Sequence, residues 1–356
     1  MKKQTLGLRT SRATSSYQYD YLVFIGRFQP FHLGHQKVVT TALAQAERVI
    51  VLVGSSAQPR CIRNPWTYSE REQFILSSFP KEVRNRLIIA PLLDDVYNEQ
   101  NWLSRVQKTV HGITCQYHPK VGQKLSIGLC GHSKDQSSYY LSLFPQWASV
   151  NVDAYESLSA TPLREAYFLN GEVSDQYPEP VREQLTSFKE TDAYQAIATE
   201  WRFIQSYKQG WEAAPYEPVF VTVDALVVQS GHVLLVERKA NPGKGLYALP
   251  GGFINPQEKL QDAVIRELRE ETRIKVPAPV LAGSIVKEQV FDDPHRSARG
   301  RTITHAFLIE LKPDAKGLPA VKGGDDAKQA FWVPLGEVDP ERMFEDHFHI
   351  INAMID

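Results

Sequence analysis

Short runs of apolar residues alternate with amphipathic stretches over residues 20–155. The apolar runs are Tyr21–Ile25, Arg48–Val53, Leu87–Ile89, Leu125–Leu129 and Val150–Ala154. The stretches between them predict helices near residues 34–46, 69–79, 101–113 and 136–143. Strands that alternate with helices of this length predict an α/β fold with a parallel, doubly wound sheet. Ligands of such sheets bind at the carboxyl ends of the strands, so the segments that directly follow the strands are the first candidates for a site.

The rest of the chain follows a different pattern. From Thr161 to about Trp211 it is mostly helical, and AAPYEP at 213–218 predicts a linker. After the linker, VFVTVDALVVQ and HVLLVERK predict a hairpin, a long helix is expected from about Gln257 to Thr272, and three strands follow at AGSIVKEQVF, TITHAFLIEL and AFWVPL. We therefore expect a tail at 1–19, one domain at 20–212 and a second α/β domain with a mixed sheet at 219–356.

Composition narrows the classes of function. The 356 residues carry a net charge of −1, whereas a nucleic-acid-binding protein usually has a basic excess or stripe. The three cysteines are widely separated, which argues against a disulfide framework and favours a reducing compartment such as the cytoplasm. No apolar run approaches the roughly 18 residues of a membrane span. The basic, Ser/Thr-rich tail is expected to be disordered, with a transit peptide as the alternative. The sequence leaves the oligomeric state open.

The stretch GRFQPFHLGH, residues 26–35, lies where the first strand ends and the first helix begins. His32 and His35 place two imidazoles on one side of that helix start, and Gly34 allows close approach of the backbone. The free N–H groups of a first helical turn favour an anion. The residues expected to contact substrate here are Gly26, Arg27, Phe28 and Gly34.

A second helix start follows the last strand of the first sheet. The segment SATPLR, residues 159–164, predicts a hydroxyl N-cap, a proline at the first helical position and an arginine one turn later. Ser159, Thr161 and Arg164 are the candidate phosphate ligands. Each of the two motifs alone has a purely structural interpretation, but together, at strand ends of one parallel sheet, they indicate a polyphosphate site.

These residues resemble a known family. HLGH and SATPLR resemble the HxGH and S-x-T-x-x-R motifs of the nucleotidyltransferase superfamily, whose sheet is Rossmann-like. GRFQPFHLGH, with NPWT and the following Glu70-Arg71, resembles the archaeal-type nicotinamide mononucleotide adenylyltransferases over about residues 20–170. The resemblance implies that ATP and nicotinamide mononucleotide are joined to give NAD and pyrophosphate. It also implies that His32 and His35 hold the ATP phosphates, and that Arg164 stabilises the leaving pyrophosphate together with Mg²⁺.

The resemblance extends to one aromatic residue of the third helix. Trp102 resembles the aromatic side chain on which the nicotinamide ring stacks. Because Trp102, Val106 and Val110 follow one another at a spacing of four residues, a stripe of core residues is the alternative interpretation. Other acceptors also stay open, namely nicotinate mononucleotide, FMN and phosphopantetheine.

Three carboxylates lie close together on the long helix expected in the second domain. At about 100° per residue, with Glu267 set to zero, Glu271 lies at about 40° and Glu270 at about 300°. All three are oriented toward the face that carries Val264 and Leu268. A salt-bridged helix surface is the alternative, but carboxylates beside an apolar face and after a Gly-Gly turn suit a hard cation such as Mg²⁺ or Mn²⁺.

The stretch GFINPQEKLQDAVIRELREETRI resembles the Nudix box, G-x5-E-x7-R-E-U-x-E-E-x-G-U. It departs from the box once, because Arg273 replaces the final glycine, so the exit from the helix is open to change. The resemblance implies a Nudix fold, assigns metal binding to Glu267, Glu270 and Glu271, and gives supporting roles to Gly252, Glu258 and Arg266.

The order of the two domains resembles bacterial bifunctional enzymes whose second activity hydrolyses ADP-ribose to AMP and ribose 5-phosphate. Arg238, Arg299 and Arg301 are candidate ligands for ribose or phosphate, with solvated surface arginines as the alternative. A second domain that senses ADP-ribose without cleaving it, or that cleaves another nucleoside diphosphate derivative, also stays open. The intact glutamates favour hydrolysis, and nothing in the sequence indicates coupling between the two sites.

Overall fold

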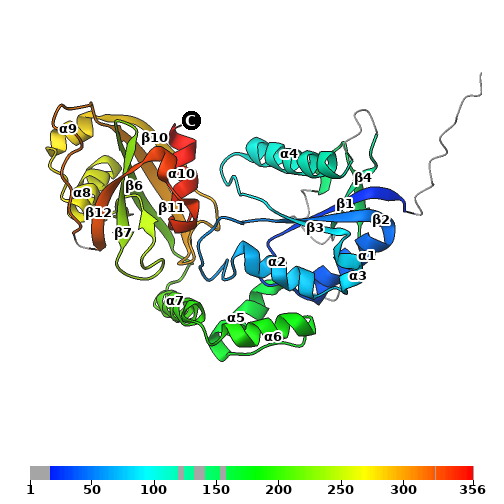
Figure 1. Cartoon of the computed structure of the whole chain (residues 1–356). Helices are drawn as coiled ribbons and strands as arrows, with labels where there is room; N and C mark the ends of the chain where they lie inside the picture. The colour runs from blue at the N-terminus through cyan, green and yellow to red at the C-terminus, as the bar shows by residue number, and fades with distance from the viewer. Residues whose placement is uncertain (1–16, 119–123, 132–140, 153–157, 325, 356) are drawn as a thin grey trace, which may run out of the picture.

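The computed structural model describes residues 17–118, 124–131, 141–152, 158–324 and 326–355, which form two separate β-sheets with their own helices (Figure 1). Most of the expected tail, most of the helix expected at 136–143 and the end of the strand expected at 150–154 lie outside the described residues. None of the described helices combines the length and the apolarity needed to cross a membrane.

The first sheet is parallel throughout, with the strand order β3-β2-β1-β4-β5. Its strands are β1 (Tyr19–Gly26), β2 (Ala46–Val53), β3 (Leu87–Pro91), β4 (Ile127–Gly131) and β5 (Ala148–Asn151). This confirms the predicted doubly wound fold. The strand order reverses between β1 and β4, and ligands of such sheets bind in the crevice at that reversal.

Helices cover both faces of this sheet because both faces are apolar. Val106 and Val110 of α4 (Glu99–Tyr117) pack on the face that carries Val23. On the opposite face lie α1 (Leu33–Gln45) and α2 (Tyr68–Ser77), as Figure 1 shows. The short α3 (Lys81–Arg84) leads into β3, and the core continues into α5 (Ala160–Asn170), α6 (Glu179–Phe188) and α7 (Asp192–Gln209). The predicted start of α5 is wrong in detail, because Ser159 is the N-cap and Pro162 therefore occupies the third helical position.

The second sheet is mixed and has the order β10-β11-β6-β7-β12, with β8 paired to β7 and β9 paired to β6. Its strands are β6 (Val219–Gln229), β7 (His232–Arg238), β8 (Tyr247–Ala248), β9 (Gly251–Phe253), β10 (Ile285–Phe291), β11 (Arg301–Glu310) and β12 (Ala327–Pro334). Strand β6 pairs in parallel with β11 and antiparallel with β7, so the predicted hairpin and mixed sheet are confirmed.

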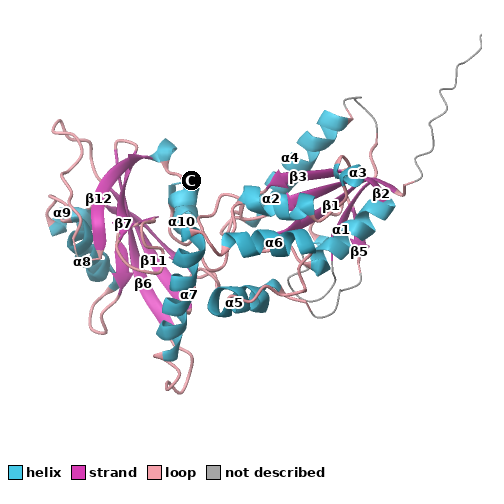
Figure 2. Ribbon diagram, turned by 60° about the horizontal axis from the view of Figure 1, so that its bottom comes forward, coloured by secondary structure: helices cyan, strands magenta, loops and turns pink. Residues whose placement is uncertain are grey.

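Two helical layers sandwich the second sheet. The long helix α8 (Leu260–Thr272) and the short α9 (Ala278–Gly283) pack on one face. The other face packs against α10 (His347–Ile355), which the sequence pattern did not predict. The two halves of the molecule meet along α7, which Figure 2 shows beside the second sheet. There the carboxylate of Glu200 accepts hydrogen bonds from the backbone N–H of Ile62 (3.4 Å) and from that of Gly243 (2.9 Å).

Candidate active sites

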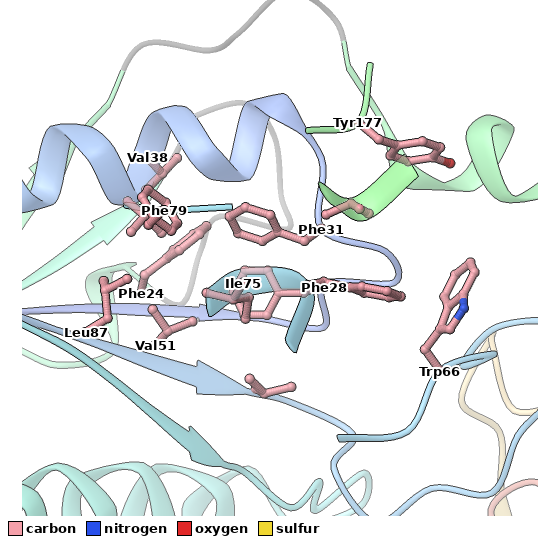
Figure 3. Packing of buried hydrophobic residues seen from close by; sticks show 14 of the residues in the cluster. Phe24, Phe28, Phe31, Val38, Val51, Trp66, Ile75, Phe79, Leu87 and Tyr177 are labelled. Carbon is pink, nitrogen blue, oxygen red and sulfur yellow. The ribbon is translucent and has the colours of Figure 1, made fainter. Parts of the chain in front are cut away.

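The loop after β1 is held in place by buried aromatic rings (Figure 3). Phe28 has a φ of 52° and is 1% exposed. Its ring faces Gly26, where a Cβ atom would lie 2.8 Å from it, and meets the His35 ring edge-on at 5.0 Å between centroids. Phe31 stacks on His35 from another side at 5.6 Å. Phe28, which we expected to contact substrate, therefore forms a buried wall behind His35.

The two histidines cap the start of α1 for each other. The backbone N–H of His35 donates to Nδ1 of His32 (3.4 Å), and the backbone N–H of His32 donates to Nδ1 of His35 (3.3 Å). The rings stack at 3.6 Å between centroids. A Cβ atom on Gly34 would lie 3.0 Å from the His32 ring, so any other residue here would force that ring to shift by a few tenths of an ångström. Because each Nδ1 accepts a hydrogen bond, each neutral ring carries its proton on Nε2, where it can donate to an anion.

Positive charge converges on the same strand end. Arg164 is buried, and it donates to the carbonyl oxygen of Gln29 (2.7 Å) and to the hydroxyl of Thr161 (3.3 Å). Burial, with the nearby charge of Arg27, lowers the pKa of Arg164 to about 10. The charge of Arg63 acts on Arg164 in the same direction. A polyanion fits such a group of cations because it offsets their mutual repulsion.

Two arginines near this site were given no individual role by the sequence analysis. Arg63 precedes the NPWT segment, and its side chain donates to the backbone oxygen of His295 in the other half of the molecule (3.0 Å). The buried Arg71 donates to the Thr67 carbonyl in its own helix (3.2 Å) and to the carbonyls of Arg27, Gly54 and Ser55 at 2.7–3.0 Å. Arg71 thereby fixes the ends of β1 and β2. The position of Arg63 beside a family-like segment was the available signal.

Ser159 and Trp102 were also expected to contact substrate. Ser159 is the N-cap of α5, and its side chain makes no capping hydrogen bond. Trp102 is half-buried against Phe144 (6.1 Å between ring centroids), in the cluster that contains Val106 and Val110. The packing of Trp102 is that of a core residue at the edge of the cluster, and a role in binding nicotinamide stays a prediction.

In the second half of the molecule, Arg266 organises the carboxylates of α8. Its guanidinium contacts Glu258 (2.6 Å), Glu267 (2.7 Å) and Glu270 (2.9 Å). The hydrogen bond from Arg266 is the main cause that lowers the pKa of Glu258 to about 2, and a hydrogen bond from the Asn255 backbone acts in the same direction. Gly252 lies directly over Glu267, because a Cβ atom there would be 2.7 Å from the carboxylate. Arg266 therefore holds Glu267 and Glu270 in place, and its supporting role at a metal site stays a prediction.

The two inward-facing glutamates are protonated more easily than usual. Burial raises the pKa of Glu271 to about 8, against a hydrogen bond that its carboxylate accepts from the backbone N–H of Gly251 (3.0 Å). Burial also raises the pKa of Glu267. The helix ends at Arg273, whose φ of 46° lies in the left-handed region that glycine commonly occupies at the end of a helix.

Among the described residues, no three His, Cys, Asp or Glu side chains are already placed so that they could hold a metal ion. The physical reason is that Arg266 engages Glu267 and Glu270 while Glu271 is directed to Gly251. The donor set nevertheless fits a divalent cation, because three carboxylates lie within about one turn of α8 and hard cations prefer oxygen ligands. A bound cation would also favour the ionised form of Glu267 and Glu271, which their burial disfavours.

The three arginines expected to bind ribose or phosphate lie in different environments. Arg238 donates to the Pro242 carbonyl (2.9 Å) and lies over the Phe344 ring. Its pKa is lowered by burial and by nearby Arg299, against the opposing charges of Glu345 and Glu271. Arg299 lies over the Phe253 ring at 5.1 Å. Arg301, in contrast, is engaged by Asp292 at the sheet edge.

Glu345 is a further candidate residue of the second site that the sequence analysis missed. Its backbone is left-handed (φ 45°) and its Oε1 atom is buried without a hydrogen-bond partner. Burial raises its pKa, which the charge of Arg299 opposes. No motif marked this residue.

Both halves of the chain match known protein families. The NUDIX domain model matches residues 218–354, and the cytidylyltransferase-like model matches residues 23–109. The chain is 40% identical over 187 residues to the nicotinamide/nicotinic acid mononucleotide adenylyltransferase of Acinetobacter baylyi, which covers 52% of this chain and 95% of that protein. It is 37% identical over 138 residues to the ADP-ribose pyrophosphatase of Methanocaldococcus jannaschii, which covers 37% of this chain and 75% of that protein.

Two solved structures match nearly the whole chain. A bifunctional NMN adenylyltransferase/ADP ribose pyrophosphatase from Francisella tularensis superposes with a TM-score of 0.87 at 41% identity, over 95% of this chain and 98% of that one. Its complex with AMP and a Mn ion superposes with a TM-score of 0.86. The chain thus belongs to the family of bifunctional NMN adenylyltransferase/ADP-ribose pyrophosphatases.

Proposed function

We propose that the chain catalyses two reactions of NAD metabolism, one beside each sheet. The first joins ATP and nicotinamide mononucleotide into NAD and pyrophosphate. The observation that carries this proposal is that three cations, Arg27, Arg63 and Arg164, act on one another at the end of β1. Arg164 is bonded to the loop that runs from there to the stacked His32 and His35 rings, at the switch point of the sheet.

The chemistry of the first reaction requires positioning more than proton transfer. A phosphate oxygen of the mononucleotide attacks the α-phosphorus of ATP, the α–β phosphoanhydride bond breaks, and pyrophosphate leaves. The attacking phosphate is already an anion, so no general base is needed. In this proposal the Nε2–H groups of His32 and His35 bind the phosphates, and Arg164 with Thr161 neutralises the leaving group, as in phosphoryl transfer generally.

The second reaction is hydrolysis of ADP-ribose. A water oxygen bonds to one phosphorus, the P–O–P bond breaks, and AMP and ribose 5-phosphate are released. The reaction depends on a divalent metal, for which we propose Mg²⁺, with Mn²⁺ as a substitute; when bound, it neutralises the diphosphate and lowers the pKa of a bound water. Glu267, Glu270 and Glu271 hold it in this proposal, Arg266 positions two of these carboxylates, and Arg238 and Arg299 contact phosphate or ribose.

Two finer points belong to the same proposal. Nicotinate mononucleotide is a second acceptor, which is supported by the 40% identical relative that is named for both mononucleotides. The boundary between the domains lies at the linker 213–218, which is supported by the NUDIX model beginning at residue 218. The proposed substrates of both sites are small nucleotides.

The test is chromatography of the products. Wild-type protein with ADP-ribose and Mg²⁺ is expected to release AMP, and Glu270→Gln is expected to release almost none. Wild-type protein with ATP and either mononucleotide is expected to form the corresponding dinucleotide. If ADP-ribose binds and neither protein releases AMP, the second domain is a sensor and the hydrolytic half of the proposal is wrong.

A further inference from the structure

A single carboxylate on α7 contacts a loop from each half of the molecule. Oε1 of Glu200 accepts a hydrogen bond from the backbone N–H of Ile62 (3.4 Å), and Oε2 accepts one from the backbone N–H of Gly243 (2.9 Å). Burial raises the pKa of Glu200, which these two hydrogen bonds and the charge of Arg238 oppose. A carboxylate removed from water is stabilised by the donors that remain to it, so Glu200 and the two loops hold one another in place.

The first of these loops contains Arg63, whose charge acts on the other two cations of the first site. Ile62 directly precedes Arg63, so its hydrogen bond to Glu200 fixes the backbone from which the arginine side chain extends. The guanidinium donates to the backbone oxygen of His295 (3.0 Å). Glu200 therefore fixes the start of this side chain, while His295 holds its end.

The second loop, residues 239–246, encloses Arg238. The guanidinium of Arg238 lies 4.0 Å from the centre of the Phe344 ring and donates to the Pro242 carbonyl (2.9 Å). Gly243 packs on the same ring, because a Cβ atom there would clash with it. The Pro242 carbonyl and the Gly243 N–H belong to one planar peptide group. The carboxylate on α7 thus binds one end of the peptide group whose other end receives Arg238.

We infer that Glu200 is a positioning residue for both proposed reactions, because its carboxylate orients the backbone before Arg63 and the peptide group that binds Arg238. Both roles rest on the proposed function, which gives the two arginines their contacts with substrate. Helix α7 belongs to the first half of the molecule and Gly243 to the second. Each site therefore depends on the junction between the halves, and a change at Glu200 alters both activities together.

The test is a pair of double-mutant cycles in the full-length protein. Glu200→Ala removes both hydrogen bonds, and small misplacements of positioning groups cost about tenfold to hundredfold in rate. We expect kcat/KM to fall by about tenfold or more both for nicotinamide mononucleotide and for ADP-ribose. In an Arg63→Ala background, the same change should alter NAD formation by less than about twofold, because Glu200 acts through the arginine. In an Arg238→Ala background, it should alter AMP release by less than about twofold.

A merely structural role gives a different pattern, since a folding defect lowers activity whether or not the arginine is present. Losses that multiply in either cycle overturn the shared role, and so does an unchanged kcat/KM in Glu200→Ala. Glu183→Ala, at an exposed position of α6, is the matched control and should behave as wild type. If Glu200→Ala does not fold, Glu200→Gln, which loses only one acceptor oxygen, is taken through the same cycles.

Failure of the proposed function is distinguishable from failure of the role of Glu200. In that case wild-type protein forms no NAD or releases no AMP. Full activity of Arg63→Ala or Arg238→Ala by itself would remove the substrate contact proposed for that arginine, and with it the half of the Glu200 role that acts through it.

Discussion

The hydroxyl of Tyr97 donates a hydrogen bond to the carboxylate of Asp346, across the boundary between the two halves of the molecule. The same carboxylate receives two hydrogen bonds from the buried Arg296 guanidinium, both at 2.9 Å. The Tyr97 ring packs edge-on against Phe291 at 4.7 Å. The loop before α4 is thus anchored to the second sheet through a buried charged group.

Replacement of Tyr97 by phenylalanine is expected to destabilise this anchor. The ring contact survives, but Asp346 loses a donor while staying buried, which costs about 2 kcal/mol for a hydrogen bond to a charged group. The midpoint of urea-induced unfolding should fall accordingly. Tyr216→Phe, at a position that is 85% exposed, serves as the control; equal shifts in the two variants would mean that the bond to Asp346 contributes nothing measurable.

Gly34→Ala is expected to impair NAD synthesis alone. The new Cβ atom would lie 3.0 Å from the His32 ring and must displace it, and small misplacements of positioning groups cost about tenfold to hundredfold in rate. Initial rates of NAD formation and of AMP release are measured on the same preparation. Gly112→Ala in α4 is the control, since its Cβ atom would meet nothing within 4 Å. A loss of both activities in Gly34→Ala would indicate a folding defect instead.

The strands and most helices could be predicted because burial on both sides of a parallel sheet leaves continuous apolar runs in the sequence. Helix α10 escaped prediction because His347 and His349 interrupt its apolar pattern, although the fold buries both. Histidines in such a segment suggest solvent exposure. Only the tertiary structure supplies the hydrogen-bond partners that stabilise them when they are buried. One of these partners is the backbone N–H of Leu249.

The spacing of residues in the sequence could locate the candidate sites but could not predict their detailed geometry. The spacing of His32 and His35 placed them on one helix start, yet their mutual capping depends on the extended backbone of His32. The buried position of Phe28 and the approach of Arg63 depend on how loops from distant parts of the chain fold together. On α8, by contrast, the contacts of Arg266 are mostly within the motif, so the family pattern anticipated them.

Arg266→Lys is expected to separate the two proposed activities. A lysine can contact one carboxylate at a time, whereas the arginine fork contacts Glu258, Glu267 and Glu270 together. Loss of such supporting contacts costs about tenfold to hundredfold in metal affinity or activity. AMP release should therefore require more Mg²⁺ while NAD formation is unchanged. Arg269→Lys, at an exposed position of the same helix, should behave as wild type; an unaltered Mg²⁺ requirement in Arg266→Lys would contradict the positioning role.

The buried imidazole of His347 is expected to make the protein less stable in mild acid. Its Nδ1 atom accepts a hydrogen bond from the backbone N–H of Leu249 (2.9 Å), and burial lowers its pKa below the ordinary 6.5. Below pH 6.5 the unfolded chain binds a proton that the folded protein does not, so stability falls by up to about 1.4 kcal/mol per pH unit until the folded-state pKa is reached. Urea unfolding at pH 8 and pH 5.5 measures this loss, which should be smaller in His347→Gln than in wild type. The exposed His295→Gln should lose as much stability as wild type, and an equal loss in His347→Gln would assign the acid sensitivity to other groups.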